Sequence, residues 1–244
     1  MKDIYGNTLG LKASEQSRLR NTYRRRVSPH EIISPELARH LTELSRETNR
    51  QVGVLLNRKG EIEHVVVGNA HKLELPDIGR ARAGQVRLRG LRLVHTHLKS
   101  EPLTKDDLTD LALLRLDMVA AIGVEETGLP GVLHYAHLVP ENGTGEFWSV
   151  AKLPDVHVTQ PDVIDTLEAL EEEFNRKAAA RRVSGREKAL LVAVCLDGNR
   201  AAAEANLAEL KELARTAGVE VLDSVLQMRR EADPRYLIGR GKLE

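Results

Sequence analysis

The sequence has a single cysteine, few aromatic residues and no net charge, and each of these shortages excludes a class of protein. One cysteine, Cys195, rules out an internal disulfide framework; it lies in the apolar run "ALLVAVCL" and is expected to be a buried core thiol in a reducing compartment. Aromatic residues make up 3% of the 244 residues, which argues against a platform of rings that stacks single-stranded nucleic acid. The 36 basic residues balance the 36 acidic ones, so any nucleic-acid contact must come from a local patch, and no DNA specificity is expected.

Long apolar runs are also missing. The opening "MKDIYGNTLG" has no apolar signal core, and no later stretch approaches the roughly 20 apolar residues that a membrane span requires. The sequence therefore predicts a cytoplasmic protein without a membrane span. Its length is sufficient for one large domain or two modest ones, and we take two as the working prediction.

Composition changes along the chain predict an α/β protein of two domains joined by a helix. The helix has an acidic first half and a basic second half, and the strand-helix-strand order after it implies a parallel crossover. The predicted segments are a basic helical leader at 1–33, a mixed-sheet domain at 34–150, a linker and connecting helix at 151–186, and a parallel βαβ domain at 187–244.

Within the mixed-sheet segment, a strand and a helix enclose a short loop. The run "LRLVHTHL" at 91–98 is typical of a buried strand, and "LTKDDLTDLALLRL" at 103–116 is typical of a helix that Thr104 caps. The remaining expectations are a hairpin at the sheet edge over 51–68, strands over 117–124 and 131–140, and irregular chain over 142–160.

Two histidines and an aspartate form a candidate metal site in this region. His95 and His97 alternate along the strand, so both rings point to one face. Asp107 follows at the start of the next helix, where its carboxylate can turn back toward the end of the strand. Two imidazoles and a carboxylate are ligands that zinc accepts.

The stretch "VHTHLKSEPLTKDD", after the hairpin "VGVLLNRKG", resembles the JAMM/MPN metalloprotease family over roughly residues 34–140. In that family an H-x-H pair and a downstream Asp bind zinc, and a glutamate at the start of the first hairpin strand acts on the zinc-bound water. The resemblance implies Zn²⁺ ligation by His95, His97 and Asp107.

The sequence departs from that family in two places. The family spacing puts the Asp at the position of Leu108, so Asp107 falls one residue short, although Thr104 keeps the hydroxyl-x-x-Asp step. The family glutamate would align near Arg50 or Gln51, and neither side chain can accept a proton from bound water. We therefore expect a degenerate domain with no catalytic residue.

The final residues, "DPRYLIGRGKLE", contain glycines and a lysine but no phosphate loop. The pattern G-x-x-x-x-G-K-[ST] requires a glycine where Tyr236 stands and a hydroxyl where Leu243 stands, and it occurs nowhere else in the chain. No GTP-binding residue is therefore expected in these 244 residues.

With the preceding "AGVEV" bend, this run resembles the N-terminal domain of the HflX family of ribosome-associated GTPases over about residues 187–244. The run carries Asp233, Pro234, Tyr236, Gly239, Gly241, Lys242 and Glu244. The resemblance implies a truncated chain whose GTPase domain, with its GTP and Mg²⁺, lies downstream, so that this chain alone should not hydrolyse GTP. It also implies two partners, the large ribosomal subunit and the protein's own GTPase domain.

The same stretch predicts an RNA- or anion-binding site. Glycines that expose backbone amides at a helix start attract phosphate, and basic side chains add to the attraction. The candidate residues are Arg229, Arg230, Arg235, Gly239, Arg240, Gly241 and Lys242.

Three functional hypotheses follow. The first is a ribosome-docking region of an HflX-like GTP-binding protein, acting on the large subunit in splitting or rescue under stress. The second is a metal-dependent JAMM-like hydrolase that uses His95, His97 and Asp107. The third is a protein-interaction scaffold. Metal analysis separates the second hypothesis from the first.

Overall fold

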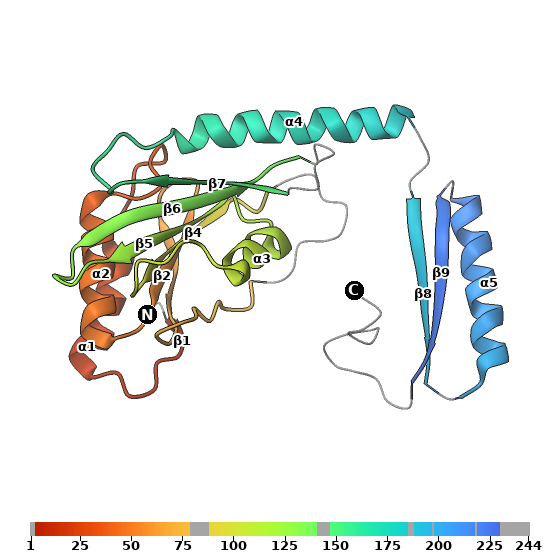
Figure 1. Ribbon diagram of the computed structural model, residues 1–244, viewed down its shortest axis with the longest axis horizontal. Coiled ribbons are helices and arrows are strands. Elements are labelled where there is room, and N and C mark those ends of the chain that lie inside the picture. Colours follow the sequence, from red (N-terminus) through yellow and green to blue (C-terminus); the bar gives the residue numbers. More distant parts are fainter. Residues whose placement is uncertain are drawn as a thin grey trace. The chain divides into compact units, whose positions relative to one another are not determined.

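The computed structural model describes residues 3–78, 88–140, 147–184, 188–196, 198–217 and 219–229. The chain divides into two compact units, which we call unit 1 (Met1–Arg176) and unit 2 (Lys177–Glu244). Unit 1 has a large mixed sheet with helices and unit 2 a parallel βαβ arrangement (Figure 1), so the predicted two-domain α/β class is confirmed.

Unit 1 is built on a seven-stranded sheet with the order β1-β3-β2-β4-β5-β6-β7. The β1/β3 and β4/β5 pairs are parallel, and the other neighbouring strands are antiparallel. The strands are β1 (Ile4–Gly6), β2 (Val52–Asn57), β3 (Ile62–Val67), β4 (Leu91–His97), β5 (Met118–Val124), β6 (Pro130–Leu138) and β7 (Trp148–Leu153).

Helices lie on both faces of this sheet. Thr96 of β4 bonds to Ser45 of α2 across one face, with 2.8 Å between the hydroxyl oxygens, while its neighbours His95 and His97 reach Asp107 of α3 on the other. The helices of unit 1 are α1 (Ala13–Asn21), the 3₁₀ turn η1 (Thr22–Arg24), α2 (Pro35–Thr48), α3 (Lys105–Leu114) and the start of α4 (Val163–Ser184).

Two expectations about the sheet are wrong. The hairpin is not the edge, because Ile4 of β1 pairs with Val65 of β3; the predicted leader at 1–33 thus supplies a strand as well as a helix. Residues Trp148–Leu153 form β7, paired with β6, within the chain expected to be irregular. The middle four residues of β7 are exposed, so its sequence lacks the alternation of apolar and polar residues that marks a half-buried strand.

A buried arginine ties the leader to the sheet. Arg92 is 2% exposed, and its guanidinium donates to the carbonyl oxygens of Ile32 (3.2 Å), Asn57 (3.4 Å) and Ser28 (3.4 Å). Burial lowers the pKa of Arg92 to about 10. Sequence patterning gave no sign that this arginine faces inward.

An ion network fastens the beginning of α4 to the sheet. Arg58, in the β2–β3 turn, donates to Asp117 at 2.7 and 3.2 Å and to Glu171 of α4 at 2.7 Å. Val163 and Leu167 of the same helix are buried. The first part of the predicted connecting helix is therefore packed on unit 1.

Unit 2 contains the predicted parallel crossover. Strands β8 (Lys188–Cys195) and β9 (Glu220–Met228) pair in parallel, and α5 (Arg200–Thr216) connects them. Asn199 caps α5 by accepting from the amide of Ala202 at 3.1 Å. Cys195 is buried, as expected for a core thiol.

Candidate metal centre

The two histidines of β4 share one buried face of the sheet. The His95 side chain is fully buried and the His97 side chain is 1% exposed. The neighbouring strand makes room for them at Gly53, where a β-carbon would lie only 2.9 Å from the β-carbon of His95 and 2.8 Å from Leu73. A larger residue at position 53 would collide with His95 and Leu73, so the glycine leaves the space that these two side chains occupy.

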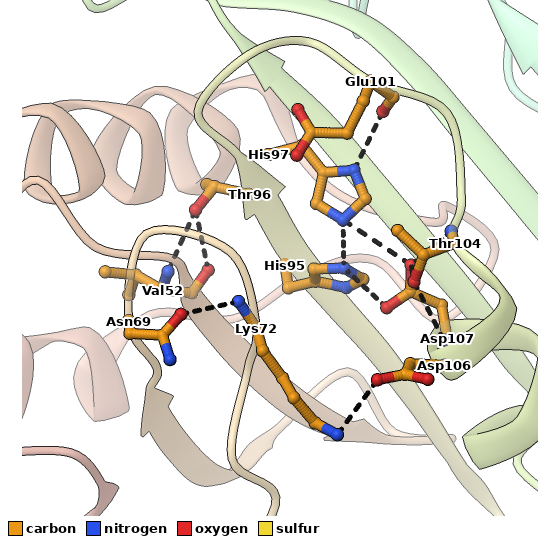
Figure 2. A network of polar contacts seen from close by, with 10 residues as sticks. All are labelled: Val52, Asn69, Lys72, His95, Thr96, His97, Glu101, Thr104, Asp106 and Asp107. Atoms are coloured by element: carbon orange, nitrogen blue, oxygen red, sulfur yellow. Dashed lines mark hydrogen bonds and ion pairs between the residues drawn. The ribbon is translucent and has the colours of Figure 1, made fainter.

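The structure brings His95, His97 and Asp107 together (Figure 2). The two Nε2 atoms are 2.9 Å apart, Asp107 Oδ1 lies 3.2 Å from His95 Nε2, and Asp107 Oδ2 lies 3.6 Å from His97 Nε2. In a tetrahedral zinc site with bonds of 2.0–2.1 Å, neighbouring ligand atoms are about 3.3 Å apart. The distance between the two Nε2 atoms and that from His95 Nε2 to Oδ1 are therefore close to the spacing that zinc needs.

Asp107 reaches the histidines because it is part of the cap of α3. Thr104 and Asp107 form a capping box, in which each side chain accepts a hydrogen bond from the other residue's backbone N–H. Ser100, in the preceding loop, has a left-handed backbone with φ of 53°. It packs so closely on Gly123 that a β-carbon added to this glycine would lie 2.7 Å from the Ser100 Oγ. This tight loop brings the start of α3 close to the end of β4.

Hydrogen bonds around the cluster decide which nitrogen can bind a metal. The carbonyl of Glu101 accepts from His97 Nδ1 at 2.8 Å, so Nδ1 carries the proton and the Nε2 lone pair faces the cluster. The 2.9 Å contact between the two Nε2 atoms requires one proton between them, and a metal would replace that proton. His95 Nδ1 is buried and has no hydrogen-bond partner among the described residues.

The charge states of the cluster suit a cation. Burial alone would raise the pKa of Asp107, but hydrogen bonding and attraction from His95, together with the bonds from Thr104, outweigh it and hold the pKa well below the ordinary value. Burial and the neighbouring His95 lower the pKa of His97 below its ordinary 6.5. An ionised carboxylate and a neutral imidazole are the forms that coordinate metals. The donor set thus fits zinc, with supporting bonds complete for His97 and Asp107.

A cleft of about 270 Å³ opens beside the cluster. Lys72, from the loop after β3, crosses it to pair with Asp106 at 2.9 Å. The Asp110 carboxylate has no hydrogen bond or ion pair among the described residues. Burial raises the pKa of Asp110, and the charge of Lys72 opposes this rise. The lining residues are Gln51, His71, Lys72, Leu73, Leu75, Leu93, His97, Thr104, Lys105, Asp106, Asp107 and Asp110.

Gln51 lies in this lining, on the residue just before β2, and it is 2% exposed. It is one of the two residues at which the metalloprotease glutamate would align. A neutral amide therefore stands on the cleft wall that would need a carboxylate for hydrolysis.

Sequence reasoning missed the role of two cleft residues. Asp110 stands three residues after Asp107 on α3, a helical spacing that puts both on one face and could have identified it. Lys72 carried no signal, because it lies in a loop whose path the sequence does not fix.

Most of the predicted RNA-binding set lies outside the described residues. Arg229 is within them, directly after β9, and its backbone N–H donates to the carbonyl of Cys195 at 2.9 Å. The set outside the described residues is Arg230, Arg235, Gly239, Arg240, Gly241 and Lys242.

Comparison with known proteins addresses the C-terminal part of the chain. Residues 204–244 match the family described as GTP-binding GTPase N-terminal. The matched range begins within α5 and includes β9, so this part of unit 2 is similar to the N-terminal region of GTP-binding GTPases. No solved structure matches the chain. Across the part of the chain that the structure describes, no helix combines the length and apolar composition that crossing a membrane requires.

Proposed function

We propose that this chain is the ribosome-docking N-terminal region of an HflX-like GTP-binding protein that acts on the large ribosomal subunit, in splitting or rescue under stress. The match of residues 204–244 to a GTPase N-terminal family supports the GTPase association. GTP and Mg²⁺ would bind a domain outside these 244 residues, since the sequence contains no phosphate-loop pattern.

The contact with ribosomal RNA would come from the basic residues at the C-terminal end. Lys and Arg side chains that neutralise phosphates release counterions, so binding should weaken as salt rises, with a log-log slope of about −0.7 to −0.9 per phosphate contact. Because the chain as a whole carries no net charge, such a slope would report a local patch.

Sedimentation of the chain with purified large subunits, at low and at moderate salt, tests this proposal. One variant replaces the predicted patch with glutamine at Arg229, Arg230, Arg235, Arg240 and Lys242. A control of equal charge change replaces five exposed basic residues of unit 1, namely Arg24, Arg25, Arg39, Lys59 and Lys99. We expect the first variant to lose binding and most of the salt slope, and the control to keep both.

Two results would count against the proposal. If the parent chain fails to sediment with subunits at low salt, docking is refuted. If the patch variant binds as well as the parent, docking does not use the predicted phosphate contacts.

A second candidate function is favoured by the meeting of His95, His97 and Asp107. We propose that unit 1 holds Zn²⁺ on these residues as a JAMM-like, metal-dependent hydrolase. When bound, zinc would act as a Lewis acid that lowers the pKa of a coordinated water. Because Gln51 cannot accept a proton, Asp110 is the carboxylate in the cleft that remains for that task.

Elemental analysis of purified protein tests this candidate. We expect about one zinc per chain in the parent, none in His95→Ala, and full zinc in His134→Ala, which removes a half-buried histidine two strands away. Peptide-bond hydrolysis that is lost in Asp110→Asn would support the hydrolase. Zinc binding without hydrolysis would reduce unit 1 to a metal-binding domain.

A further inference from the structure

One carboxylate serves both the cap of α3 and the metal cluster. Asp107 Oδ2 accepts two hydrogen bonds from Thr104, one from its backbone N–H and one from its hydroxyl, each 2.7 Å long. The Thr104 hydroxyl oxygen in turn accepts from the Asp107 amide at 3.3 Å. These three bonds close a ring between the two residues, so the carboxylate cannot rotate without breaking at least two of them.

The two carboxylate oxygens are therefore not equivalent. Oδ2 accepts both bonds from Thr104 and lies 3.6 Å from His97 Nε2, whereas Oδ1, which has no bond to Thr104, lies 3.2 Å from His95 Nε2. Oδ1 is therefore the oxygen that remains available to a metal beside His95.

We propose that Thr104 is the positioning residue of the metal centre: it holds Oδ2 of Asp107 and so presents Oδ1 to the metal as a single ligand atom. This inference rests on the proposed zinc site of unit 1. Because the Thr104 hydroxyl donates its one proton to Asp107, it has none to offer a substrate in the cleft.

The loop before Thr104 makes the same kind of contribution to a second ligand. The carbonyl of Glu101 holds His97 Nδ1 at 2.8 Å, and Ser100 turns this loop onto Gly123 of β5. Residues 98–104 therefore orient two of the three proposed ligands, His97 and Asp107.

The alternative is that Thr104 acts only as a helix cap. Ser34 provides the comparison, because its side chain caps α2 of the same unit by accepting from the Leu37 amide at 3.3 Å, without contact to a metal ligand. Removing either cap should cost helix stability, but only the loss of Thr104 should affect metal affinity.

The test is a Zn²⁺ titration of the whole chain, in competition with a chromophoric chelator. Thr104→Ala should bind zinc about 10- to 100-fold more weakly than the parent, which is the range typical for losing a residue that supports a ligand. Thr104→Ser should keep the parent affinity, because it keeps the hydroxyl. Ser34→Ala should melt at a lower temperature in chelator and still bind zinc with the parent affinity.

Each outcome decides a question. Parent affinity in a folded Thr104→Ala variant would leave Thr104 as a cap only and overturn the inference, while the proposed zinc site would stand. A parent chain that binds no zinc would overturn both. If Thr104→Ala does not fold, as judged by circular dichroism, Thr104→Val replaces it, because valine keeps the side-chain shape and the backbone N–H. Parent zinc affinity in Thr104→Val would equally overturn the inference.

Discussion

Zinc should stabilise the folded chain by an amount set by its concentration relative to its dissociation constant. The two Nε2 atoms are 2.9 Å apart and His95 Nε2 lies 3.2 Å from Asp107 Oδ1, close to the roughly 3.3 Å between ligand atoms of a tetrahedral site. A ligand that binds only the folded state stabilises it by about 2.7 kcal/mol at 100 times its dissociation constant. For a chain of this length, that corresponds to a rise in Tm of about 5–11 °C.

The assay is thermal unfolding followed by circular dichroism, with zinc and with chelator. The full rise is expected in the parent and in His134→Ala, and no rise in His95→Ala or Asp107→Asn. Asp107→Asn is informative because it removes the charge while leaving the side-chain volume nearly unchanged.

Two results would refute this reasoning. One is a parent Tm that does not change at zinc concentrations well above micromolar. The other is an equal rise in His95→Ala, which would show that zinc binds at a different place.

Three further predictions concern the surrounding structure. Burial, and then the charge of Arg25, lowers the pKa of His40 from 6.5 to about 4. As the pH falls, the unfolded state therefore takes up the proton before the folded state does. The contribution of neutral His40 to the free energy of unfolding is fully present above pH 6.5 and falls by up to about 3 kcal/mol as the pH drops to 4. His40→Gln should show a shallower fall in urea unfolding over this range, and an unchanged fall would contradict the assignment. Arg92→Ala should lower the free energy of unfolding in urea by about 3–5 kcal/mol, because it leaves a cavity and buried carbonyls without donors. The exposed control Arg24→Ala should lower it by less than about 0.5 kcal/mol. Gly53→Ala should displace His95 and weaken zinc binding in the chelator competition; parent affinity would show that the site adapts to the added methyl group.

Local patterns predicted the elements around the site well. The alternation in "LRLVHTHL" placed both histidines on one face of β4, and Thr104 capped α3 as its sequence indicated. These signals succeed because they depend on chain geometry over a few residues.

The differences arose where distant parts of the chain meet. A strand as short as β1 exists because β3 offers it an open edge. The middle of β7 is exposed and shows no alternation, so only its pairing with β6 makes it a strand. Spacing rules also could not show that Ser100 adopts a left-handed turn in the loop before Asp107. The inward position of Arg92 depends on carbonyl groups from three separate segments.

The glutamine on the cleft wall has a consequence for engineering. An amide and a carboxylate differ by NH₂ in place of an oxygen, so Gln51→Glu would change neither the volume nor the backbone at that position. It would supply a negative oxygen within a pocket already lined by His97 and Asp107. If unit 1 binds zinc, Gln51→Glu therefore offers a second carboxylate, besides Asp110, with which hydrolytic activity could be engineered.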